Sequence, residues 1–276
     1  MKHTRCLDGL RRMGAGLLVA ATTAAMAGSV SAQDEKVYGP DPEQEIRGGV
    51  LTVGSLVEPP ALDPFHQGAD ARIRVTTLIY QGLFYEGTSG PIPLLATGYE
   101  VSDDGLTYTF SLRDGVKFHT GEDMTAADVK YSYDYLRDPD NGSPAAGDFT
   151  TVESIDAVDD LTVVFNLNQP NASLPITLGN KYGAVVPAGY FDDEGARAAL
   201  NQKSVGTGPF KVANYETNSF LELTRFEDYW QEGIPYLDGV TFLFMPNNAA
   251  LLVALRNERI DFASLGRPQD AEQLEG

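Results

Sequence analysis

The residues of this sequence that could do chemistry are few and scattered. Apart from His3, the histidines are His66 and His119, which lie in separate segments, and neither has a second ligand at the spacing of a metal site. The single cysteine, Cys6, precedes an apolar run near the start of the chain. The body of the chain therefore has no cysteine for a disulfide, a thiolate ligand or a cysteine nucleophile. We expect no metal site and no cofactor.

Catalytic motifs are also lacking after the apolar run. The sequence contains no G-x-S-x-G nucleophile elbow, no G-x-x-x-x-G-K-[ST] phosphate loop and no G-x-G-x-x-G fingerprint. Aspartate pairs at 103–104, 159–160 and 192–193 could act as catalytic carboxylates, but the first two lie at predicted hairpin turns, where Asp suits the backbone. Residues 138–142 (DPDNG) resemble a calcium loop without its flanking helices and closing Glu, so a solvated loop is the better interpretation. We expect no catalytic residues.

The first 32 residues have the pattern of a secretory signal peptide. Cationic residues precede an apolar run at 14–27, and small residues follow up to Ala32, where we predict cleavage. The run is shorter than the roughly 20 residues that cross a bilayer. Arg11 and Arg12 leave twin-arginine export as an alternative to the general secretory route, although the residues after them do not match. Cys6 lies on the wrong side of the run for a lipid anchor, so we expect a soluble periplasmic protein.

Composition limits the class of partner. The formal net charge is −19, which argues against binding to nucleic acid or anionic lipid. Hydrophobic residues make up 42% of the chain, enough for one large or two small domains. We therefore expect a packed hydrophobic core without disulfide bonds or structural metal ions.

The elements that must position any site begin after a polar, proline-containing leader at 33–47. Residues 50–53 predict a short buried strand, and a proline-rich loop follows. Apolar residues at helical spacing predict a helix over 72–83. The clearest strand is 106–113, in which apolar and polar residues alternate, so that one face is buried and one is exposed.

Turn and cap signals organise the next stretch. Asp-Gly pairs before and after the 106–113 strand predict hairpin turns, with 116–118 as the return strand. Thr125 and Asp128 form a capping box that begins a helix. The inner face of this helix carries Val129, Tyr133 and Leu136.

Two further hairpins and a crossover complete the pattern. The hairpins pair 152–155 with 162–167 and 210–212 with 221–223, and residues 168–208 return the chain from one lobe to another. They are followed by a strand at 240–245 that is apolar on both faces. A helix at 248–257, capped by Asn247, and a strand at 260–262 come next. Strand, helix and strand in this order predict a parallel α/β crossover.

Several motifs of this chain resemble a known family. They are GGVL at 48–51, LDP at 62–64, YEVSDDGLTYTFSLRDGVKFH at 99–119, MTAADV at 124–129, GTGPF at 206–210 and FEDYW at 226–230. In this order they are similar to the family 5 extracellular solute-binding proteins, the oligopeptide-, dipeptide- and nickel-binding kind. The resemblance covers nearly the whole chain after the signal peptide.

The resemblance implies a fold and a function. The fold is α/β: a periplasmic-binding-protein-like (type II) lobe with an inserted hairpin-rich α+β domain, and a second lobe across a hinge. The function is that of a monomeric carrier that delivers a small solute to the permease subunits of an ABC transporter in the inner membrane. The first expectation for the solute is a peptide, with a nickel chelate, an opine or a sugar as alternatives.

The same resemblance predicts the domains. The first ligand-binding lobe comprises 48–79 and 203–276, and the inserted domain comprises 80–202. Such proteins are about twice as long as this chain, so we expect an N-terminal fragment whose second lobe is missing. Most ligand contacts would then be absent, and the sequence does not select the solute.

The predicted ligand contacts lie at strand ends, where ligands of α/β sheets bind. They are Leu56, Val57 and Glu58 after the first strand, and Ser264 after the last. Against a carrier stand two other classes: a secreted enzyme with its site in the missing half, and a regulatory or surface protein built on the same fold. A carrier returns its ligand unchanged, and deletion of its gene abolishes solute uptake.

Overall fold

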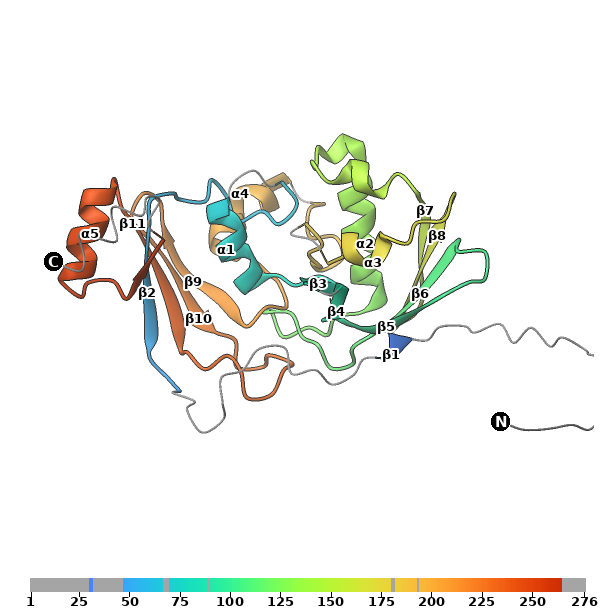
Figure 1. Ribbon diagram of the computed structural model, residues 1–276, viewed down its shortest axis with the longest axis horizontal. Coiled ribbons are helices and arrows are strands. Elements are labelled where there is room, and N and C mark those ends of the chain that lie inside the picture. Colours follow the sequence, from blue (N-terminus) through green and yellow to red (C-terminus); the bar gives the residue numbers. More distant parts are fainter. Residues whose placement is uncertain are drawn as a thin grey trace, which may run out of the picture.

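A computed structural model describes residues 30–31, 47–66, 70–88, 90–179, 182–192 and 194–264 (Figure 1). Two five-stranded sheets organise the chain. The predicted signal peptide and leader lie outside the described residues, apart from Val30, Ser31 and Arg47. The strands of one sheet, apart from a short strand at 30–31, lie in the sequence between the strands at 50–55 and 210–216, which both belong to the other sheet.

The first sheet, here the mixed sheet, combines parallel and antiparallel pairs. Its strands in spatial order are β12 (Phe262–Ala263), β2 (Val50–Ser55), β11 (Gly239–Phe244), β10 (Phe220–Arg225) and β9 (Phe210–Glu216). β2 is parallel to both β11 and β12, and β9, β10 and β11 are antiparallel neighbours. Helix α5 (Asn248–Arg256) covers one face, and α1 (Asp70–Ile79) and α4 (Glu194–Lys203) cover the other (Figure 1).

The predicted crossover is confirmed, and β2 lies between its two strands. The Asn247 side chain accepts the Ala250 N–H at 2.9 Å and begins α5. The last strand starts at Phe262, two residues later than predicted. The Thr52 N–H donates to the Asp261 side chain at 2.7 Å, so this donor of β2 is bound by a side chain and not by a strand partner. The prediction that 50–53 is buried is wrong. Val50 is 54% exposed, since the short β12 pairs only with the second half of β2.

The second sheet is antiparallel. Its strands in spatial order are β1 (Val30–Ser31), β5 (Ala96–Val101), β6 (Thr107–Leu112), β8 (Thr162–Leu167) and β7 (Val152–Asp159). The alternation predicted for β6 is confirmed, because Tyr108, Phe110 and Leu112 are buried. Helix α2 (Ala126–Arg137) packs on β7 and β8 over this buried face (Figure 1).

The helix prediction at 125–128 is confirmed. The Asp128 carboxylate accepts the Thr125 N–H at 2.7 Å at the start of α2. Val129, Tyr133 and Leu136 are fully buried, as expected. Fully burying side chains of this size stabilises the fold by about 2 kcal/mol each.

Two predicted elements differ from the structure. Residues 116–118 do not pair with β6, because β5 and β8 already occupy both of its edges. They form a tight loop instead. The Val116 carbonyl accepts the Met124 N–H, and the Phe118 N–H donates to the Glu122 carbonyl. The helix predicted over 72–83 ends at Ile79, whose carbonyl accepts the Gly208 N–H at 2.9 Å.

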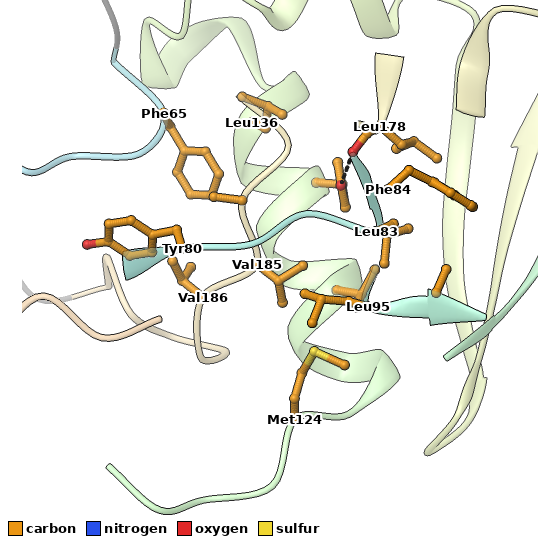
Figure 2. Close-up of a cluster of buried hydrophobic side chains, with 14 of the residues drawn as sticks. Phe65, Tyr80, Leu83, Phe84, Leu95, Met124, Leu136, Leu178, Val185 and Val186 are labelled. Carbon is orange, nitrogen blue, oxygen red and sulfur yellow. Dashed lines mark hydrogen bonds between the residues drawn. The ribbon is translucent and has the colours of Figure 1, made fainter. Parts of the chain in front are cut away.

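One hydrophobic core runs through both sheets. It includes Phe110 and Phe165, whose rings meet edge to face at 5.3 Å between centroids. Phe84 of β3 (Phe84–Gly87), Leu174 of helix α3 (Leu174–Thr177) and Phe149 of the 3-10 turn at Ala146–Phe149 also belong to it. The strand β4 (Gly90–Pro93), which pairs with β3, and the 3-10 turn at Pro139–Asn141 have no buried residue. Figure 2 shows a part of this core, to which Tyr80, Leu83 and Val185 contribute. The sheets therefore share buried side chains.

Candidate functional site

The three parallel strands of the mixed sheet have their carboxyl-terminal ends on the same side of the sheet, which is called the carboxyl edge below. β2 ends at Ser55, β11 at Phe244 and β12 at Ala263. The Met245 N–H donates to the Ser55 carbonyl at 2.7 Å and ties two of these exits together. Ligands of α/β sheets bind at the carboxyl ends of the strands. This edge is therefore the candidate site.

The wall loop, residues 55–60, leaves the edge from β2 and carries three of the predicted contact residues. Leu56 is 39% exposed and Val57 is 51% exposed. The Ser55 hydroxyl donates to the Val57 carbonyl at 2.8 Å and accepts the Val57 N–H at 3.3 Å, which turns the loop locally. Two adjacent apolar side chains thus face solvent on a hydrogen-bonded turn.

Glu58, the third predicted residue of the wall loop, already has partners. The Tyr215 hydroxyl lies 2.7 Å from Glu58 Oε1, and the Asn218 N–H donates to Oε2 at 2.9 Å. The same hydroxyl lies 3.0 Å from the Pro59 carbonyl. Burial, followed by the Glu58 carboxylate, raises the pKa of Tyr215, so its hydroxyl stays protonated as a donor.

Ser264 reaches the same edge through strand pairing. Ala263 pairs with Gly54, so the exposed Ser264 follows at the level of Ser55. The structure therefore brings all four predicted residues to one edge of one sheet. Beside them, Phe262 on β12 is 52% exposed.

Sequence reasoning missed Tyr215 and Asn218. The hairpin that pairs 210–212 with 221–223 was predicted, but nothing in the sequence shows which residues lie against its turn. Strand order supplies the answer. β10 pairs antiparallel with β11, which brings the β9–β10 turn to the edge where β2 ends.

A second polar cluster lies where the two sheets meet. The buried Gln81 side chain accepts the Trp230 indole N–H at 2.9 Å and the Thr207 hydroxyl at 3.3 Å, and donates to the Tyr229 hydroxyl at 2.7 Å. Burial raises the pKa of Tyr229 to about 12. The Arg113 guanidinium lies 4.2 Å over the Trp230 ring. Gln81 thus contacts Thr207, Tyr229 and Trp230, so the cluster holds together segments that are distant in sequence.

The two histidines have structural partners. His119 Nε2 donates to the Gly208 carbonyl at 3.0 Å, Nδ1 lies 3.4 Å from the Gly206 nitrogen, and burial lowers the pKa of His119 to about 4. His66 lies between Asp63 Oδ2 at 2.9 Å and the Asn141 carbonyl at 2.6 Å. Each histidine therefore joins segments that are distant in sequence.

The acidic pairs at 103–104 and 159–160 behave as turn residues, whereas the Asp192 side chain accepts the distant Tyr131 hydroxyl at 3.1 Å. Asp104 accepts the Ser102 hydroxyl and the Leu106 N–H, and the Ser102 hydroxyl lowers the pKa of Asp104. Asp159 accepts the Leu161 N–H at 2.9 Å. Asp193 lies outside the described residues. Among the residues described, no three acidic, histidine or cysteine side chains group as metal ligands, and no helix has the length and apolar character of a membrane span.

Comparison with known proteins gives consistent relatives. The family described as "Bacterial extracellular solute-binding proteins, family 5 Middle" matches residues 90–276, more than half of the chain. The glutathione-binding protein GsiB of Pectobacterium atrosepticum is 31% identical over 248 residues, and GsiB of Salmonella typhimurium is 33% identical over 215 residues. These matches cover 90% and 78% of this chain, and 45% and 41% of the relatives.

Solved structures resemble the chain to a similar extent. The periplasmic binding protein DppA from Helicobacter pylori, in complex with the peptide STSA, is 32% identical with a TM-score of 0.76, over 84% of this chain and 50% of DppA. AgaA of A. tumefacien R10, in complex with agropinic acid, is 31% identical with a TM-score of 0.76, over 83% of this chain and 46% of AgaA. The chain thus spans about half the length of the proteins that it matches.

Proposed function

This chain belongs to the bacterial extracellular solute-binding proteins of family 5, and we propose that it is the periplasmic solute-binding component of an ABC transporter. It binds a peptide or a peptide-like solute such as glutathione and delivers it unchanged to the permease. The proposal is supported by relatives that are named for binding glutathione or that hold a peptide.

The observation that carries the proposal is the exposed apolar pair Leu56 and Val57 at the carboxyl edge of the mixed sheet. Ligand sites are mostly apolar surfaces with a few polar groups that fix orientation. We propose that the solute lies against Leu56, Val57 and Ser264, on the loop that Glu58 holds in place. Residues 48–79 and 203–276 then form the ligand-binding lobe, and 80–202 form an inserted domain that shares its core.

Calorimetry on the full-length gene product tests the function. The solute panel consists of glutathione, the peptides Ser-Thr-Ser-Ala and Met-Leu, a nickel–histidine chelate and agropinic acid. We expect micromolar or tighter binding of a peptide or of glutathione, with the bound solute recovered chemically unchanged by mass spectrometry. Binding of none of the panel, or conversion of the solute to a product, would contradict the proposal.

Cell fractionation tests the location. We expect the protein in the periplasmic fraction with a new N-terminus near Gln33. Recovery of the uncleaved apolar run on the mature protein would show that the predicted signal peptide is wrong.

A further inference from the structure

We propose that Glu58 is the anchor of the wall loop and not a partner of the ligand, and that Tyr215 and Asn218 are its positioning residues. This inference rests on the proposed function, because it assigns roles within the same edge. It also limits the chemistry of that edge: the solute meets an uncharged, apolar wall here, and its charged groups are recognised elsewhere.

The geometry assigns both oxygens of Glu58 to the β9–β10 hairpin. Oε1 lies 2.7 Å from the Tyr215 hydroxyl, and Oε2 accepts the Asn218 N–H at 2.9 Å. Asn218 has a φ of 60°, a left-handed conformation that Asn tolerates better than most residues. The hairpin tip is itself fixed, because the Phe244 N–H donates to the Ser219 carbonyl at 2.9 Å.

Burial and charge favour an anchor. Tyr215 is 8% exposed, so its hydroxyl needs a partner inside the protein, and Glu58 supplies a charged acceptor. A bidentate set of donors from one hairpin fixes the direction of the carboxylate. A ligand ammonium group would have to share these oxygens with the Tyr215 hydroxyl and the Asn218 N–H, which already occupy one acceptor site on each oxygen.

Among the described residues, those that directly follow β2, β11 and β12 at this edge are uncharged, and the nearest exposed carboxylate on the neighbouring hairpin is Glu216 at the end of β9. Ser55, Leu56 and Val57 follow β2, Met245 and Pro246 follow β11, and Ser264 follows β12. Leu56 and Val57 are the exposed apolar members of this set. The substrate class that fits is therefore a solute with an apolar side chain, such as a peptide with an aliphatic or thioether residue.

The anchor is tested without any ligand by a double-mutant cycle. Glu58→Gln and Tyr215→Phe should each lower the urea midpoint of unfolding, and the double variant should lose clearly less than the sum, since both variants break one interaction. Glu216→Gln, an exposed neighbour on the same hairpin, is the matched control and should leave the midpoint unchanged. Additive losses would overturn the anchor, whatever the protein binds.

The ligand side is tested with Met-Leu and N-acetyl-Met-Leu. Glu58→Gln and Tyr215→Phe should weaken both peptides by the same factor, so that the ratio of the two Kd values stays at the wild-type value. If Glu58 paired with the amino terminus, Glu58→Gln would bring this ratio towards one while Tyr215→Phe would not, and the proposal would be wrong. Absence of Met-Leu binding by the wild-type protein would overturn the apolar wall, whereas absence of binding by the whole solute panel would overturn the proposed function. Neither outcome changes the unfolding result.

The apolar wall has its own test. Replacement of Leu56 and Val57 by Ser should weaken Met-Leu by about tenfold, the factor expected when two methyl-sized contacts are lost. Gly-Gly, which has no side chain to bury, should be weakened much less. Equal weakening of both dipeptides would show that these residues do not select an apolar side chain.

Discussion

The side-chain oxygen of Gln81 accepts the indole N–H of Trp230 at 2.9 Å, across 149 positions of sequence. Gln81 lies where the chain leaves α1 for the antiparallel sheet, and Trp230 follows β10 of the mixed sheet. The bond therefore joins the segment between α1 and β3 to the segment between β10 and β11. Thr207, on the segment that returns to β9, donates to the same oxygen at 3.3 Å.

Replacement of Gln81 by Leu should destabilise the protein by about 2 to 3 kcal/mol, because buried donors of Trp230 and Thr207 lose their acceptor. Urea unfolding measures the loss. Trp230→Phe removes only one donor and should cost less. A Gln81→Leu protein as stable as the wild type would show that the cluster does not hold these segments together.

Gly206 to Ala should also be costly. A Cβ at this position would lie 2.1 Å from the Ile79 carbonyl oxygen, so the two backbones must separate. Overpacking of this kind costs about 1 to 3 kcal/mol. Gly147→Ala is the control, since nothing lies within 4 Å of its Cβ, and thermal unfolding should distinguish the two. Equal melting temperatures would contradict the close approach.

Phe110 to Asp should unfold the antiparallel sheet. Phe110 is fully buried, and a carboxylate without a partner at this position costs several kcal/mol. Ser111→Asp, on the exposed face of the same strand, should change stability by less than about 0.5 kcal/mol. Circular dichroism during heating compares them, and a similar loss in both would mean that the buried face is assigned wrongly.

His119 should make stability depend on pH. Burial lowers the pKa of His119 to about 4 from an ordinary value of 6.5, so the unfolded chain binds the proton first as the pH falls. The contribution is complete above about pH 6.5 and is lost progressively towards pH 4. As the pH is lowered from 7 to 4, the unfolding free energy should therefore fall more steeply in the wild type than in His119→Gln. Parallel curves would rule out this role.

Much of the local structure was predictable because it depends on neighbours in sequence. The alternation in β6, the capped start of α2 and the hairpin of β9 and β10 each follow from residues within one element or turn. The same holds for the strand–helix–strand unit at 239–263. The motif resemblance added the family, which the match over residues 90–276 confirms.

Pairing between distant elements was decided by the tertiary structure. Residues 116–118 have the composition of a strand, but both edges of β6 are occupied, and no local pattern reveals this. For the site, the sequence by itself determined that Leu56, Val57, Glu58 and Ser264 follow strands. Only strand order brought the β9–β10 turn over the wall loop, and with it Tyr215, 157 positions away, onto Glu58. Such contacts form only after long loops have closed, and the balance of sheet pairing and core packing that closes them is a property of the whole chain.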